Sequence, residues 1–437
     1  MRNTLSLIIF TITLTGCSYL SNKFESLAER KKGNVKPVVT LTPKINYCAP
    51  ATKLEYISED ETLLKFYKSL HPALFENKNI PFVQKAIMLS LIEMSRRPDE
   101  ASPFSRFQVY LKLNGQSYYY DFRPKKLEDD TKMPFVKGLD YLTRKFVTSQ
   151  SLSAIAAHLD NVVPKSINVS PEFEDFLREN RTDLLKNDTL MNQFFKGDEG
   201  LTRYETLDRI NFNNLIQQYQ TGAYSKDADY EFDKNGLTAN KSKSESYQTN
   251  CNYDLSKELS LRDELLSSEF KKAHTFGLSE GDNYFLAVSS ATLYKPFKTM
   301  GKLSYFMKAR PSPFPLPVCE MKGKNQEIVL ISSSGRNPVQ HLQHLVSYEV
   351  EQVESSYMLN ELLNFSRHLF LTNPDRILYE SKRGRKAQLD FFLAMNFPIY
   401  HVESLGNVFG HATFKTDKKV ESSLHIDDRS QARLWCK

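Results

Sequence analysis

The chain has 437 residues and a formal net charge of +6, from 58 Lys and Arg against 52 Asp and Glu. A charge this small over this length argues against a nucleic-acid partner. The length exceeds that of one ordinary core and predicts two or three domains. The 29 Phe and 22 Tyr residues supply enough aromatic side chains to build such cores.

The first sixteen residues have the features of a secretory signal. Arg2 precedes an apolar run over 5–14, which is shorter than the roughly 20 apolar residues that span a bilayer. A charged start, a short apolar run and small residues before a cleavage site are typical of such a signal. We therefore expect residues 1–16 to be removed during export.

The signal ends in Leu14-Thr15-Gly16-Cys17, which resembles the lipobox of bacterial lipoproteins. The resemblance implies that Cys17 is acylated, that the bond before it is cut, and that the protein contacts a membrane through this lipid. Ser18 resembles the outer-membrane delivery signal of lipoproteins in Gram-negative bacteria. The alternative interpretation is an ordinary cleaved signal followed by a chance cysteine.

Residues 17–46 are polar and predict a tether that holds the folded body away from the membrane. The region 47–220 predicts a helix-rich domain, because apolar residues recur there at helical spacing. A hairpin over 107–122 interrupts the helices, since Asn114-Gly115 stands between two runs rich in Tyr and Phe. The expected helices lie at about 134–148, 151–160, 171–187 and 202–219.

Residues 221–254 are rich in Ser, Lys, Asp and Asn, and they predict a polar linker or long loop. The region 255–437 predicts an α/β-like domain, because apolar strands alternate with helices there. The fold class expected for the whole chain is α+β. The elements expected in the last region are helices at about 256–273, 338–347, 350–370 and 385–396, and strands at 284–288, 328–331, 377–380, 398–403 and 407–415.

Four cysteines remain after Cys17. An exported protein meets an oxidising compartment, so an even number favours two disulfides. Three pairings are possible; we favour Cys251 with Cys319, which leaves Cys48 with Cys436 to join the chain ends. The spacings are too wide for a zinc or redox motif, and the sequence predicts neither a metal nor a cofactor.

A Ser-rich loop follows the strand expected at 328–331. Its residues Ser333, Ser334, Gly335 and Arg336 stand before an expected helix, where backbone amides and a helix dipole can bind an anion. The alternative, which we favour, is that the loop only caps the next helix.

Three histidines near the carboxyl end could carry chemistry. The order strand, helix, strand, followed by 410–415, resembles one half of a phospholipase D-type fold. That resemblance implies a nucleophilic histidine that attacks phosphorus and a cationic lysine that stabilises the developing charge. Thr413 stands where that family has its lysine. The candidates are His401, His411, His425, Lys415, Asp427 and Asp428. The alternative is an α/β layer with histidines on a solvent face.

Two smaller groups have simpler interpretations. His341 and His344 lie three residues apart and could chelate a metal, but ordinary surface or half-buried histidines explain the spacing better. The basic residues around Gly384 could meet lipid phosphates or an anionic glycan, and a solvated surface is the favoured alternative.

These observations favour a lipid-anchored envelope protein that is not catalytic and binds a partner protein or an anionic glycan or lipid. The alternative is an envelope-anchored hydrolase, for example a phosphodiesterase-like one, that uses the C-terminal histidines. Abundant carboxylates leave a glycosidase open as well, because its two carboxyl groups need not be close in sequence.

Overall fold

The structure is a computed structural model of the whole chain. It describes residues 45–48, 54–58, 61–75, 77, 79–126, 132–222, 224–226, 230–233, 238–240, 248–253, 273–293, 295–300, 303–312, 315–333, 338–347, 350–371, 375–384, 386–396, 398–416, 419–430 and 432–436. Within these residues, no helix has both the length and the apolar character needed to cross a membrane.

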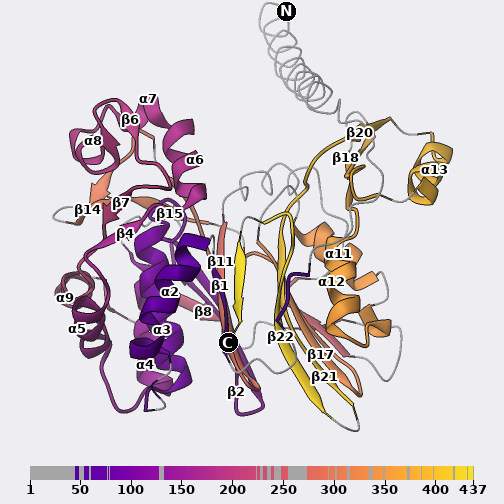
Figure 1. Ribbon diagram of the computed structural model, residues 1–437, viewed down its shortest axis with the longest axis horizontal. Helices are drawn as coiled ribbons and strands as arrows, with labels where there is room; N and C mark the ends of the chain where they lie inside the picture. Colours follow the sequence, from indigo (N-terminus) through magenta and orange to yellow (C-terminus); the bar gives the residue numbers. More distant parts are fainter. Residues whose placement is uncertain are drawn as a thin grey trace, which may run out of the picture.

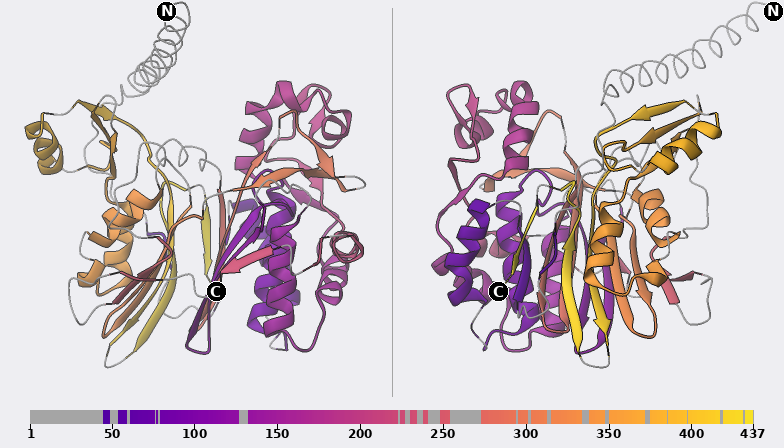
Figure 2. Two further views of the ribbon diagram at one scale, coloured as in Figure 1. Left: turned by 180° about the vertical axis from the view of Figure 1, so that it is seen from behind. Right: turned by 45° about the vertical axis from the view of Figure 1, so that its right-hand side comes forward.

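Two β-sheets pack face to face, and helices cover the outer face of each sheet (Figure 1). The layers therefore run helix, sheet, sheet, helix, and the view from behind shows the same order (Figure 2). Each interface between layers has its own buried apolar cluster. The predicted α+β class is confirmed.

The first sheet draws its strands from both halves of the chain. Its order is β23-β1-β11-β12-β2-β3-β8, and β15 pairs with β12 beside this path. The predicted hairpin is present as β2 and β3, with positive φ at Asn114 and Gly115. The strands are β1 (Leu54–Ser58), β2 (Arg106–Leu113), β3 (Gln116–Pro124), β8 (Tyr230–Asp233), β11 (Ala273–Glu280), β12 (Asn283–Leu293), β15 (Ala309–Pro311) and β23 (Arg433–Cys436).

The helices of the N-terminal half cover the outer face of this sheet and bury their apolar sides in the largest core cluster. They are α2 (Glu61–Leu74), α3 (Phe82–Arg96), α4 (Pro134–Phe146), α5 (Leu152–Val162) and α9 (Phe212–Thr221). A smaller group extends beyond one end of the layer: α6 (Pro171–Glu179), α7 (Arg181–Leu184), α8 (Asp188–Phe194), β4 (Ser166–Asn168), β5 (Phe195–Lys196), β6 (Glu199–Gly200), β7 (Thr206–Asp208), β13 (Thr299–Met300) and β14 (Leu303–Met307).

The second sheet has the order β22-β21-β17-β16-β10-β9. Helices α11 (Pro338–Ser347) and α12 (Ser356–Asn364) cover its outer face, and the short helix η3 (Val350–Gln352) lies between them in the chain. The strands are β9 (Thr238–Asn240), β10 (Gln248–Cys251), β16 (Val318–Lys322), β17 (Gln326–Ser332), β21 (Val408–Lys415) and β22 (Val420–Ile426).

A three-stranded sheet with one helix projects from the second layer (Figure 1). It consists of β18 (His368–Leu371), β19 (Arg376–Tyr379), α13 (Lys386–Ala394) and β20 (Ile399–His401). Strand β19 pairs with β18 in the antiparallel sense and with β20 in the parallel sense, as expected for strands joined through a helix.

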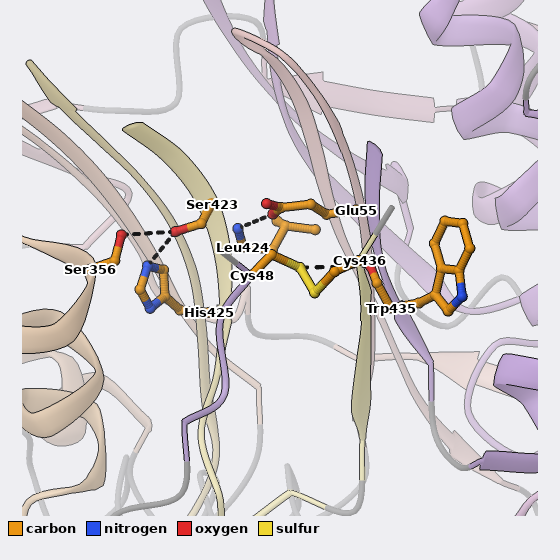
Figure 3. The surroundings of a disulfide bond; sticks show 8 residues. All are labelled: Cys48, Glu55, Ser356, Ser423, Leu424, His425, Trp435 and Cys436. Atoms are coloured by element: carbon orange, nitrogen blue, oxygen red, sulfur yellow. Dashed lines mark hydrogen bonds between the residues drawn. A yellow bond between two sulfur atoms is a disulfide. The ribbon is translucent and has the colours of Figure 1, made fainter. Parts of the chain in front are cut away.

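Both predicted disulfides are present. Cys251 and Cys319 lie opposite each other on β10 and β16. Cys48 and Cys436 join the two ends of the described chain, although 388 residues separate them in sequence (Figure 3).

Several predicted elements differ from the structure. Residues 202–219 hold strand β7 and helix α9 instead of one helix, and 350–370 hold η3, α12 and the start of β18. The segment 221–254 was expected to link two domains. The regions on its two sides instead build one sheet together, because β1, β2 and β3 share a sheet with β11 and β12. The expected helix at 256–273 lies outside the described residues except for Ala273, which begins β11.

Candidate functional site

A pocket of about 270 Å³ opens at one end of the space between the two sheets. The first helical layer and both sheets contribute to it, together with helix α6. The elements concerned are the loop after α3, the start of β11, the loop before β21 and the turn between β22 and β23. Its lining residues are Arg97, Asp99, Glu100, Glu172, Asp175, Phe176, Glu179, Ala273, His274, Thr275, Ser333, Asn407, Phe409, Arg429, Ser430 and Ala432.

Thr275 lies on the inner face of the first sheet, toward the second. It stands opposite Val288 on β12, and Val288 belongs to the core between the sheets. Ser279, four residues further along β11 and hence on the same face, approaches His411 of the second sheet with 3.4 Å between Oγ and Nε2. The side chain of Thr275 therefore points into the inter-sheet space at the pocket.

The hydroxyl of Thr275 has no hydrogen-bond partner among the described residues, although only 6% of the residue is exposed. A buried hydroxyl without a partner costs about 1–3 kcal/mol. Such a group calls for an explanation, and a catalytic role is one of the recognised ones. By contrast, the Ser430 Oγ in the same pocket accepts a hydrogen bond from the Ala432 amide at 3.0 Å.

The neighbouring His274 points to the opposite face of β11. Its Nε2 lies 2.9 Å from Oε2 of Glu93 on α3. Tyr67 donates its hydroxyl proton to the same carboxylate, and Arg96 lies 3.7 Å from it. These buried contacts hold the start of β11 against the helical layer and thereby set the position of Thr275.

Negative charge dominates the pocket wall. Arg97 is bound by both Asp99, at 3.1 Å, and Glu100, at 2.5 Å, so its positive charge is compensated. Helix α6 adds Glu172, Asp175 and Glu179, whose spacing of three and four residues places them on one helical face.

Arg429 lines the pocket and belongs to a buried network of ion pairs. It binds Glu380, with 2.8 Å between Nε and Oε1, and Asp427, with 2.9 Å between Nη1 and Oδ1. Burial lowers the pKa of Arg429, but the two carboxylates outweigh it and leave the pKa raised. Arg367 binds the other oxygen of Asp427 at 2.5 Å. Burial raises the pKa of Asp427, yet Arg367 and Arg429 outweigh this and hold it low.

Of the candidate site residues from the sequence, Ser333 lines the pocket. Its amide donates a hydrogen bond to the Asn407 carbonyl at 3.0 Å. The other members of that loop, Ser334, Gly335 and Arg336, lie outside the described residues, as does Cys17.

The histidines near the carboxyl end are packed inside the second layer and do not meet in one cleft. His411 faces the first sheet and stacks on Tyr284, with 3.8 Å between ring centroids. His425 faces the helices, bonds Ser423 at 2.9 Å and is fully buried. Burial lowers the pKa of both imidazoles, to about 3 for His425.

The remaining candidates are also apart from one another. Asp427 accepts from the Val408 amide at the start of β21, whereas Lys415 is exposed at the end of that strand, roughly 20 Å away at 3.3 Å per residue. His401 lies on β20, and Asp428 pairs with Arg383. His341 binds the Leu405 carbonyl at 2.7 Å. The described residues contain no group of His, Cys, Asp or Glu placed to hold a metal ion.

Solved structures with a similar fold are known. A structure of LmbA2991 has a TM-score of 0.63 at 9% identity, covering 92% of this chain and all of that one. Cephalosporin acylase from Bacillus halodurans has a TM-score of 0.59 at 8% identity, covering 92% of this chain and 99% of that one. No protein-family model and no curated protein matches the sequence.

These neighbours have folds like those of N-terminal-nucleophile hydrolases. The expectation of a non-catalytic binding or scaffolding protein is therefore wrong, and the hydrolase alternative is favoured. The sequence analysis missed the pocket because Thr275 lies on β11, a strand that was not predicted; the expected elements there were a helix ending at 273 and a strand at 284–288. The run 273–280 and the Gly281-Asp282-Asn283 turn before the next strand are a hairpin signal that could have located it.

Proposed function

We propose that this chain is a hydrolase that cleaves an amide bond in the pocket at the end of the two sheets, with Thr275 as its nucleophile. The observation that carries the proposal is the buried Thr275 hydroxyl, which faces the pocket and has no partner among the described residues. Ala273, the first residue of β11, has only a methyl side chain and cannot act as the nucleophile. The fold shared with an acylase supports the same reaction class.

In this reaction the Thr275 oxygen attacks the carbonyl carbon of the amide. The C–N bond breaks, the amine leaves with the hydroxyl proton, and an acyl ester remains on the threonine. Water then attacks the ester, releasing the carboxylic acid and restoring the hydroxyl. The proposal assigns His274 no proton transfer, because it binds Glu93 on the other face of the strand; its part is to position β11.

The test is hydrolysis of a panel of acyl p-nitroanilides by the full chain in detergent. Thr275→Ala is expected to lower kcat/KM at least about a hundredfold, since the nucleophile is removed. Thr249→Ala is the matched control, because Thr249 is also 6% exposed but lies on β10, outside the pocket. An acyl adduct on the peptide that contains Thr275 would identify the nucleophile directly. Activity that survives Thr275→Ala would overturn the assignment.

We also propose that the protein is held at the bacterial envelope by lipid on Cys17, most simply at the outer membrane. The support is the lipobox-like Leu14-Thr15-Gly16-Cys17 and the polar 17–46 that follows it. The described fold begins at residue 45, so such a tether would leave the pocket in the aqueous compartment.

A further inference from the structure

The facing side chains of the two sheets change in kind where they reach the pocket. Deeper between the sheets these side chains are large and apolar, among them Ile331 on β17 and Phe409 on β21. Side chains alternate along a strand, so Ser333, two residues beyond Ile331, continues the inner face of β17. Asn407, two residues before Phe409, continues the inner face of β21 in the same way. Because packed sheets lie about 10 Å apart, these shorter polar side chains leave a space, and Thr275 faces it from the first sheet.

The loop that leads into β21 is fixed by buried side chains. The Leu405 amide donates to Glu380 Oε1 at 2.7 Å, and Nε2 of His341 lies 2.7 Å from the Leu405 carbonyl oxygen. Arg367 donates to the Gly406 carbonyl at 2.5 Å. Gly406 has a φ of 150°, which suits a residue without a Cβ atom. Because Glu380, His341 and Arg367 are buried, the contacts that hold this loop are shielded from water.

The next two residues of the chain are held in the same way. The Asn407 carbonyl accepts from the Ser333 amide at 3.0 Å, and the Val408 amide donates to Asp427 at 3.1 Å. Among the described residues, Asn407 forms a hydrogen bond only through that carbonyl. Its side-chain amide therefore stands on a backbone that is held at several points, and it can donate to a ligand in the pocket. A donor held in place beforehand loses little freedom when the ligand binds.

Arg429 lines the same wall of the pocket, but its donors are already used. A guanidinium group has five N–H donors, and all five of them are engaged in Arg429. They donate to Glu380, to Asp427 and to the carbonyls of Leu363 and Phe365. A ligand that needs a hydrogen bond on this wall must therefore take it from a neutral group. The Asn407 side chain reaches further from its backbone than a serine hydroxyl does.

We propose that the side-chain amide of Asn407 donates a hydrogen bond to the carbonyl oxygen of the scissile amide, while Thr275 attacks the carbon from the opposite sheet. This inference rests on the proposed function, because it takes the pocket as the site of cleavage. When the threonine oxygen bonds to carbon, the carbonyl oxygen gains the electron pair of the C=O double bond. A donor placed beforehand stabilises that charge. The pair returns when the C–N bond breaks and the amine leaves with the hydroxyl proton, so Asn407 keeps its own protons.

A small ester tests this contact on the unaltered full chain in detergent, because an acetyl group needs little of the pocket. p-Nitrophenyl acetate should acetylate Thr275 and release p-nitrophenolate, which is followed by absorbance. Mass spectrometry of the peptide that contains Thr275 locates the acetyl group. The corresponding thionoester has sulfur in place of the carbonyl oxygen, and sulfur is a weak hydrogen-bond acceptor. Relative to the rates of both esters with hydroxide, the thionoester is expected to acylate Thr275 at least about tenfold more slowly.

Variants of Asn407 test the donor directly. Asn407→Leu keeps the size of the side chain without the donor, and it is expected to lower the rate of Thr275 acetylation about a hundredfold or more. Asn407→Asp, which cannot donate when ionised, should lose at least as much, and both variants should lose the preference for the oxygen ester. Asn325→Leu is the matched control and should keep the wild-type rate. Asn325 is exposed at the other end of the pairing between β17 and β21, where its carbonyl accepts from the Lys415 amide at 2.7 Å.

The outcomes distinguish this inference from the proposed function. If the unaltered chain gains no acetyl group on Thr275, the nucleophile and the Asn407 contact are both wrong. If Thr275 is acetylated but the two esters react equally relative to hydroxide, the Asn407 contact is overturned and the nucleophile stands. A folded Asn407 variant that matches Asn325→Leu in rate would overturn the contact as well. The comparison of the two esters does not require any variant to fold.

Discussion

A carboxyl oxygen of Glu55 on β1 accepts a hydrogen bond from the backbone amide of Leu424 on β22, with 2.6 Å between oxygen and nitrogen. This bond joins the two sheets beside the Cys48–Cys436 disulfide (Figure 3). The other carboxylate oxygen has no partner among the described residues. Burial raises the pKa of Glu55 to about 8, although the Leu424 amide acts in the opposite direction.

The free energy of unfolding should fall as the pH rises from 4.5 to about 8, the interval between the ordinary and the folded-state pKa of Glu55. Between its ordinary pKa of 4.5 and about 8, Glu55 keeps its proton in the folded chain and loses it in the unfolded chain. The unfolded chain therefore binds fewer protons, and the free energy of unfolding decreases with pH, by at most about 5 kcal/mol. Glu55→Gln should flatten this dependence in urea unfolding at pH 5 and 8.5, whereas Glu199→Gln on exposed β6 should not. An unchanged slope in Glu55→Gln would contradict the prediction.

Replacing Thr275 by valine should separate stability from activity. Valine has the same shape without the hydroxyl, and removing a buried hydroxyl that has no partner costs little or is favourable. We expect Thr275→Val to keep or raise the midpoint of thermal unfolding, with a gain of up to about 2 kcal/mol in the free energy of unfolding. Hydrolysis should be lost. A marked drop in the midpoint would show that the hydroxyl has a structural partner.

The ion pairs behind the pocket should be needed for both the fold and the site. Arg429 donates to Glu380, Asp427 and the carbonyls of Leu363 and Phe365. Lysine cannot reproduce these contacts, because its single ammonium nitrogen cannot donate in several fixed directions as the planar guanidinium does. Breaking a buried ion pair costs about 3–5 kcal/mol. We expect Arg429→Lys to lower the free energy of unfolding by that order and to reduce kcat/KM. Arg178→Lys, at an exposed pair on α6, is the control, and equal effects would argue against the network.

Lipid attachment can be checked independently of the fold. Cells grown with radiolabelled palmitate should incorporate label into the full chain, and Cys17→Ser should abolish it, because the acylated sulfur is removed. Cys48→Ser serves as the comparison, since Cys48 is a disulfide partner. Label that persists in Cys17→Ser would rule out the proposed anchor.

Local signals in the sequence located several elements well. Asn114-Gly115 predicted the hairpin of β2 and β3, and the helix expected at 338–347 is α11. The favoured pairing of Cys251 with Cys319, which left Cys48 with Cys436, is also present. The layers could not be predicted, because β1 pairs with β23 and β11 across more than two hundred residues, and no local pattern encodes such contacts.

The candidate site was predicted only at Ser333. The sequence analysis left the histidines either as catalytic candidates or as residues on a solvent face. In the structure β21 lies between β17 and β22, with the first sheet over one face and helices over the other. His411 and His425 are therefore buried on opposite faces. Which face a strand residue occupies, and what covers it, depends on the second sheet.

The Cys48–Cys436 bond turns the chain into a covalent ring for nearly its whole length. A single break in the backbone anywhere between these cysteines leaves two fragments that remain one molecule. A break in 254–272, the segment just before β11, would also be spanned by the bond between Cys251 and Cys319. A nicked protein would thus migrate as one species until it is reduced.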